Sequence, residues 1–191
     1  MNPAEVREVL ERRGALLEGH FVLSSGRHSD LFVQKFRVFE DPRLTQSFGA
    51  ALAHLFEGEF DAVASPAVGA IPLGFATALA ADTRVLFAER VEGRMAFRRG
   101  FELRPHERTL VVEDVVTTAD SAREVVELVG ASGGRAIGVG ALIDRGDEAR
   151  TESVGVPLRS LLQLETVSWT PQKCPLCDRG DPLTDPGSRR V

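Results

Sequence analysis

Lysine and cysteine are scarce in this chain, and long apolar runs are missing. Two cysteines, Cys174 and Cys177, are too few for a disulfide framework, so packing must supply the stability of the fold. No apolar run approaches the length of a membrane span, and Met1–Arg13 carries charges where a secretory signal needs an apolar segment. We therefore expect a cytoplasmic protein of one domain without a membrane partner.

An excess of positive charge is also missing. The formal net charge is −5 at pH 7, which argues against a nucleic-acid partner. Lys35 and Lys173 are the only lysines, so arginine supplies nearly all the positive charge. One short stretch concentrates it in Arg90, Arg94, Arg98, Arg99, Arg104 and Arg108. Phosphate chemistry in this chain would depend mainly on arginine.

Short apolar segments alternate with helical patterns from residue 61 onward. Strands are predicted at 62–65, 84–88, 109–113, 136–143 and 158–164. Helices are predicted at 70–81 and 121–131, after a first half with helices near 3–13 and 42–57 and strands at 21–23 and 31–36. Strands that are apolar on both faces and separated by helices indicate an α/β fold with a parallel sheet. Ligands of such folds bind at the carboxyl ends of the strands.

The segment from Thr109 to Ser121 is the most informative. A buried strand ends in adjacent carboxylates, Glu113 and Asp114, and small hydroxyl-bearing residues then lead into a helix. Such a loop offers backbone N–H groups and hydroxyls to an anion, and the helix dipole favours its negative charge. The carboxylates suit ribose hydroxyls or a metal bound to a sugar diphosphate. On composition alone, a strand before a helix capped by Asp120 or Ser121 explains the segment equally well.

The order of residues in this segment resembles the phosphoribosyl diphosphate loop of the type I phosphoribosyltransferases. The resemblance implies a Rossmann-like parallel sheet flanked by helices, with a small N-terminal hood. It places phosphoribosyl diphosphate at Glu113, Asp114, Val115, Val116, Thr117, Thr118, Ala119, Asp120 and Ser121. Family members usually have glycine where this chain has Ala119, so a positive φ there would make alanine costly. ATP-loop and dinucleotide-binding motifs are absent.

Three more segments resemble the orotate phosphoribosyltransferases. Residues 23–33 are similar to the family segment over the base, which implies orotate contacts at Phe32 and Val33; a phenylalanine can also pack on a flat heterocycle. Residues 65–73 are similar to the loop under the diphosphate, which implies a role for Gly69. The resemblance places Arg145 at the orotate carboxylate, which a planar guanidinium can bind through two parallel hydrogen bonds, and adds Thr117 to the orotate site.

Each of these three segments has an ordinary structural alternative. The first can be a plain hairpin turn, and the second a helix entry that needs small residues. In the third, Arg145 can pair with Asp144 or Asp147 instead of a ligand.

The segment Glu89–Arg99 resembles a mobile family loop that closes over the partner subunit's site and carries lysines and a histidine. Here it has neither residue type, so we predict that Arg90 and Arg94 act in catalysis together with Asp114. Arginine neutralises diphosphate oxygens but stays protonated, which makes it a poor general acid. The resemblance also implies a homodimer with shared active sites. Solvated surface charge is the alternative.

Together these features predict transfer of ribose 5-phosphate from phosphoribosyl diphosphate to orotate, with Mg²⁺ bound alongside the diphosphate. The single domain would comprise a hood segment (1–40), a sheet core (60–165) and a tail (166–191). Two alternatives stay open: a phosphoribosyltransferase for another base, and a non-catalytic regulator that senses phosphoribosyl diphosphate.

The tail contains the pair Cys174-Pro175-Leu176-Cys177. This spacing is half of a zinc site, which histidines or a second subunit could complete, and it also suits a redox-sensitive disulfide. Because a single C-x-x-C is a weak signal, the prediction from sequence is that no metal binds here.

Overall fold

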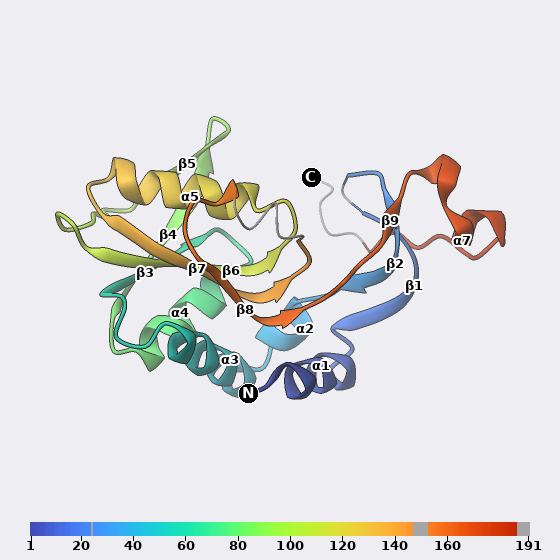
Figure 1. Ribbon diagram of the computed structural model, residues 1–191, viewed down its shortest axis with the longest axis horizontal. Helices are drawn as coiled ribbons and strands as arrows, with labels where there is room; N and C mark the ends of the chain where they lie inside the picture. The colour runs from blue at the N-terminus through green and yellow to red at the C-terminus, as the bar shows by residue number, and fades with distance from the viewer. Residues whose placement is uncertain (24, 147–152, 187–191) are drawn as a thin grey trace.

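The computed structural model describes residues 1–23, 25–146 and 153–186, which form a sheet core and a smaller hood (Figure 1). Among these residues a six-stranded sheet has the order β5-β4-β3-β6-β7-β8. Its strands are β3 (Ala62–Pro66), β4 (Arg84–Val91), β5 (Arg94–Phe97), β6 (Arg108–Val116), β7 (Arg135–Asp144) and β8 (Leu158–Gln163). Every neighbouring pair is parallel except β4 and β5, which confirms the predicted parallel sheet.

Helices cover both faces of this sheet, as Figure 1 shows. One face packs against α3 (Pro42–Leu55) and α4 (Ile71–Ala80), and the other against α5 (Asp120–Ala131). The two faces carry separate apolar clusters, one centred on Phe48, Leu52 and Phe56 and the other on small residues such as Val111 and Val139. The central strand β3 is buried along its whole length, as expected for a strand covered on both sides.

Close packing of α3 on α4 depends on a glycine. A Cβ on Gly49 would overlap the backbone of Ala76, so the two helices approach more closely than larger side chains allow. The start of α3 is equally specific: Asp41 accepts hydrogen bonds from the backbone N–H groups of Arg43 and Leu44, and Pro42 follows the cap. No helix in the described ranges combines the length and apolarity that a membrane crossing requires.

The hood is a three-stranded sheet with the order β1-β2-β9. It comprises β1 (Leu16–Val22), β2 (His28–Val33) and β9 (Ser168–Trp169), next to α1 (Pro3–Arg12) and α2 (Phe36–Phe39). The tail, with a 3-10 turn (Pro171–Lys173) and α7 (Pro175–Asp178), is therefore part of the hood rather than an appendage. Figure 1 shows the hood beyond the carboxyl ends of β6 and β7.

The segment Glu89–Arg99, which resembles a mobile loop of the family, has strand structure over most of its length. Strands β4 and β5 pair through this segment as an antiparallel hairpin, and the turn consists of Glu92 and Gly93. Both turn residues have positive φ, 48° and 83°, as the tight two-residue turns that match strand twist require. Figure 1 shows the hairpin turn projecting from the sheet. The strand pattern was hard to recognise because β5 is an edge strand, with Arg94 exposed and its other three side chains only partly buried.

Ala119 stands between β6 and α5 with φ 62° and ψ 5°, the left-handed conformation. This conformation costs alanine about 1–2 kcal/mol. Burial of the Ala119 methyl group stabilises the fold by about 0.8 kcal/mol. Glycine at this position would cost roughly 0.5–1 kcal/mol more in backbone entropy on folding than alanine does.

We expect Ala119→Gly to leave the free energy of unfolding within about 1 kcal/mol of wild type. Ala119→Val should lower it by roughly 1–3 kcal/mol, because a β-branched residue tolerates positive φ poorly. Denaturant unfolding followed by circular dichroism measures both. Ala80→Val, at an exposed helical position, is the matched control. Equal stability of the two valine variants would contradict a conformational constraint at Ala119.

Candidate active site

The segment that we predicted to bind phosphate joins β6 to α5. Residues 115–121 line a small hollow together with Glu113 and Ala122. Ala119 occupies the N-cap position of α5, and no side chain caps the helix there. Asp120 pairs with Arg123 at 2.9 Å instead, so the alternative of a helix capped by Asp120 or Ser121 does not hold. The first N–H groups of α5 are thus left without a side-chain cap, which suits an anion.

Glu113 lies below this loop with only 8% of its surface exposed. Burial, together with the neighbouring Asp114 carboxylate, raises the pKa of Glu113 to about 8. The side chain is therefore mainly protonated at neutral pH and can donate a hydrogen bond as well as accept one. Its Oε1 accepts the backbone N–H of Asp114 at 3.0 Å.

Asp114 is buried and makes an ion pair with Lys35, whose Nζ lies 2.5 Å from Asp114 Oδ2. The other carboxylate oxygen accepts the backbone N–H of Val115 at 2.6 Å. Gly69 packs against the same pair: a Cβ at this position would overlap both Asp114 Oδ2 and Lys35 Nζ. A larger residue where the loop after β3 meets the end of β6 would therefore displace the paired Asp114 and Lys35 side chains.

Lys35 was not among the site residues predicted from sequence. It follows strand β2 of the hood and stands at the N-terminus of α2. One signal for it was present, because it is one of only two lysines in a chain that otherwise uses arginine. Its partner Asp114 lies 79 positions later in the chain, so only the folded structure shows that the two side chains pair.

Arg145 directly follows β7 at the same edge of the sheet, and its backbone N–H bonds to the carbonyl oxygen of Val116. Its Nε donates to Thr166 Oγ1 at 3.2 Å. Burial lowers the pKa of Arg145 from its ordinary value, and the Asp30 carboxylate of the hood counteracts this. In the described part of the chain Arg145 forms no ion pair with Asp144, and Asp147 lies outside the described residues. A half-buried guanidinium thus lies near the hood strand.

The hood strand β2 offers backbone rather than side chains at Phe32 and Val33. The Phe32 ring is buried against Phe21, with 5.7 Å between the ring centroids, so it is not free to stack on a heterocycle. Strand β9 pairs only with His28 and Ser29 of β2. Among the described residues, the edge of β2 after Ser29 therefore keeps backbone groups that no strand pairs. Ser24, where the family often has lysine, lies outside the described residues.

The structure separates the two arginines that we predicted to be catalytic. Arg90 donates to the Gly93 carbonyl oxygen at 2.6 Å and pairs with Glu124 of α5 at 3.0 Å. Arg94 is exposed next to the hairpin turn. Arg99 makes two hydrogen bonds of 2.9 Å to Glu89, which lowers the pKa of that carboxyl. Arg94 is thus the better placed of the two for reaching beyond its own chain.

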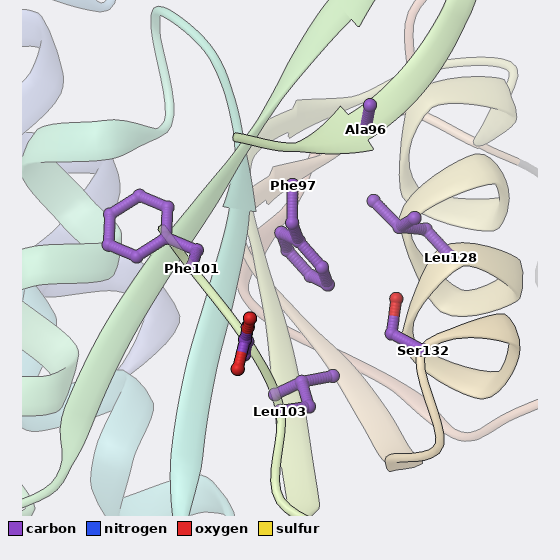
Figure 2. Close-up of a pocket in the computed structure, with 7 residues that line it drawn as sticks. Ala96, Phe97, Phe101, Leu103, Leu128 and Ser132 are labelled. Carbon is purple, nitrogen blue, oxygen red and sulfur yellow. The ribbon is translucent and has the colours of Figure 1, made fainter. Parts of the chain in front are cut away.

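A larger hollow, of about 430 Å³, lies at the other end of α5. Figure 2 shows Phe97 of β5 and Leu103 facing Leu128 and Ser132 at the end of the helix. Because α5 has 12 residues, roughly 18 Å of helix separates its two ends, and the hollow is not part of the phosphate site.

Comparison with known proteins gives a consistent result, although no family model matches the chain. It is 44% identical over 192 residues to the orotate phosphoribosyltransferase of Caldanaerobacter subterraneus, with full coverage of both chains. It is 45% identical over 185 residues to that of Thermotoga maritima, covering 96% of this chain and 98% of the relative.

Solved structures agree. An orotate phosphoribosyltransferase from Aeropyrum pernix matches with a TM-score of 0.71 and 28% identity, covering 84% of this chain and 94% of that one. The Mycobacterium tuberculosis enzyme in complex with phosphoribosyl diphosphate matches with a TM-score of 0.66 and 28% identity, covering 85% and 96%. The fold is that of the type I phosphoribosyltransferases, and the full-length identity above 40% shows that this chain belongs to the orotate phosphoribosyltransferase family.

Proposed function

We propose how this chain carries out its family's reaction, the transfer of ribose 5-phosphate from phosphoribosyl diphosphate to orotate. The products are orotidine 5′-phosphate and diphosphate, in pyrimidine nucleotide synthesis. One observation carries the proposal: an uncapped helix N-terminus, two buried carboxylates and a half-buried arginine meet at the same edge of a parallel sheet. Each group has the charge or hydrogen-bonding capacity that one part of the two substrates needs.

The phosphate loop binds the 5-phosphate. The backbone N–H groups at the start of α5, with the hydroxyls of Thr117, Thr118 and Ser121, surround the anion, while Glu113 and Asp114 hold the ribose hydroxyls. Glu113 is mainly protonated before the substrate arrives and can donate to one ribose oxygen. Lys35 pairs with the Asp114 carboxylate and brings an ammonium group to the side of Gly69 where the diphosphate would rest.

Orotate would lie between Arg145 and the unpaired edge of β2. Its carboxylate accepts hydrogen bonds from the Arg145 guanidinium, and the backbone at Phe32 and Val33 meets the polar edge of the ring. Thr117 stands at the end of β6 beside Val116, which bonds to the Arg145 backbone. Only an anionic base gives Arg145 a charged partner, which is the basis of selectivity over neutral bases.

Mg²⁺ would accompany the diphosphate. The oxygen donors of this site fit a hydrated Mg²⁺, because both Asp114 oxygens keep a lone pair beyond their contacts with Lys35 and Val115. When bound, the ion supplies positive charge to the diphosphate oxygens. The protein itself contributes Lys35 and the hairpin arginines to the same charge, and no covalent intermediate is required.

A homodimer with shared sites completes the proposal. Three apolar side chains are largely exposed on and before α4: Val68 (74%), Phe75 (59%) and Leu79 (59%). Val68 is next to Gly69, so a second copy covering this patch would lie beside the active site. The exposed hairpin with Arg94 would then reach the partner's diphosphate.

We expect Arg145→Ala to weaken orotate binding by roughly 2 kcal/mol or more, since the carboxylate loses a charged partner. Affinity for phosphoribosyl diphosphate should stay near wild type. Calorimetry with each substrate, and turnover of orotate against uracil, measure the change. Thr166→Val, which removes the protein partner of Arg145, is the control and should keep most activity. Unaltered orotate affinity in Arg145→Ala would assign the residue a structural role only.

Asp114→Asn should weaken phosphoribosyl diphosphate binding at least about tenfold, because the ribose loses a charged acceptor and Lys35 loses its partner. The matched control is Asp61→Asn, which breaks the exposed pair with Arg108 at the opposite end of β6. Calorimetry with the ligand and thermal unfolding separate binding from stability. Wild-type affinity in Asp114→Asn would refute the ribose-binding role.

Subunit mixing tests the shared site. An Arg90→Ala/Arg94→Ala chain and an Asp114→Asn chain should each be nearly inactive alone. After full exchange of an equal mixture, half of the dimers hold one intact site, so activity should recover to roughly a quarter of wild type. Glu124→Gln, which frees Arg90 from its ion pair, should remain active. Exchange without recovery would show that the hairpin does not serve the partner's site.

A further inference from the structure

The cysteine pair of the tail does not stand alone in the folded protein. His20 of β1 and His28 of β2 face Cys174 and Cys177, and one ligand atom from each residue lies within 4.8 Å of the others. Cys174 (0%), His20 (4%) and His28 (5%) are buried, and Cys177 closes the cluster from the surface. These side chains come from segments about 150 positions apart.

Four of the six distances between the ligand atoms are close to the edges of a tetrahedral metal site. His20 Nε2 lies 3.5 Å from Cys174 Sγ and 3.7 Å from Cys177 Sγ, and His28 Nδ1 lies 3.3 Å from Cys177 Sγ. With Zn–S of about 2.3 Å and Zn–N of about 2.0 Å, a tetrahedron has N···S edges of about 3.5 Å. The two ring nitrogens are 2.9 Å apart, slightly closer than the edge of about 3.3 Å from the same bond lengths.

A hydrogen bond outside the cluster sets the tautomer of His20. Its Nδ1 lies 2.8 Å from the backbone carbonyl oxygen of Asp181, and a carbonyl can only accept, so Nδ1 carries the proton. In the neutral ring Nε2 then has its lone pair directed at the cluster. That single lone pair can accept only one hydrogen bond, although three polar atoms, from His28 and the two cysteines, lie close to it. A histidine oriented through its second nitrogen by a carbonyl is the usual arrangement around bound zinc.

The part of the structure around the cluster has a small apolar core, although backbone pairing also joins the tail to the hood. The buried residues Phe21, Phe32, Cys174 and Leu176 belong to neither of the two main apolar clusters of the described residues. Backbone contacts between the hood and the tail include the two hydrogen bonds between Thr184 and residues His20 and Val22. A small unit with a small core gains most from a metal cross-link.

We propose that His20, His28, Cys174 and Cys177 bind one structural Zn²⁺ that fastens the tail to the hood hairpin. All four positions are filled by protein, as in structural rather than catalytic zinc sites. His28 begins the strand that continues to Phe32 and Val33, so the ion would also hold the hood strand in place. The prediction from sequence that no metal binds at the cysteine pair is thereby replaced by its alternative, completion of the site by histidines.

The test uses the full chain, produced without a histidine tag in zinc-supplemented medium. Elemental analysis should find about one zinc ion per chain in wild type, and the same in His54→Gln, a histidine variant outside the cluster. Cys177→Ser should hold less than about a tenth of a zinc ion per chain. Cys177 is partly exposed, so its serine variant should still fold. A strong chelator should lower the melting temperature of wild type but leave that of Cys177→Ser unchanged.

Cobalt supplies a second measurement that does not depend on variants. Apo wild type mixed with Co²⁺ should develop the intense visible bands of a tetrahedral ion and the near-ultraviolet band of thiolate ligation, and added Zn²⁺ should remove both. Three results would overturn the proposal: purified protein without zinc and two freely reactive thiols, a Cys174–Cys177 disulfide in protein kept under reductant, or Co²⁺ spectra identical in wild type and Cys177→Ser.

Discussion

The ion pair between Lys35 and Asp114 connects three parts of the chain that meet at the proposed active site. Asp114 ends a buried strand, and an ionised carboxylate at that depth is costly without a positive partner. Lys35 comes from the segment that follows the hood strand β2, and Gly69 from the loop after β3 closes against both groups. This one contact therefore joins the hood, the loop after β3 and the end of β6, and the absence of a side chain at Gly69 leaves room for it.

The positive charges of the chain come from two lysines, one of them at Asp114, and from many arginines elsewhere. With two lysines in the whole chain, the one beside Asp114 stands where a flexible point charge can serve both a carboxylate and a diphosphate. Arginine supplies the remaining charge, and several of the described arginines are held in ion pairs: Arg90 with Glu124, Arg99 with Glu89 and Arg108 with Asp61. A tight turn at Glu92 and Gly93 makes this region a hairpin, so its arginines are presented by a paired strand instead of a free loop.

The strands of the hood come from both the N-terminal and the C-terminal part of the chain. Its third strand, β9, and the segment around Thr184 come from the tail, while β1 and β2 come from the first residues after α1. The apolar contacts within it are few compared with the core of the sheet domain. Polar side chains, His20 and His28 with the two cysteines, occupy the position where a larger domain would bury an apolar cluster. With the proposed zinc bound, the stability of the hood would depend in part on these four residues.

The amino-acid sequence by itself determined the parallel sheet, the entry from β6 into α5 and the strain at Ala119. These are local features, because neighbouring residues in the sequence encode each of them. They are a strand buried on both faces, two adjacent carboxylates and a helix entry of small residues. Tertiary structure alone decided that Lys35 meets Asp114, that the Phe32 ring turns onto Phe21, and that His20 and His28 join Cys174 and Cys177. Those contacts join residues that are far apart in the chain or depend on strand register. Hydrophobic periodicity predicts local secondary structure, so it does not show which distant side chains come into contact in the folded protein.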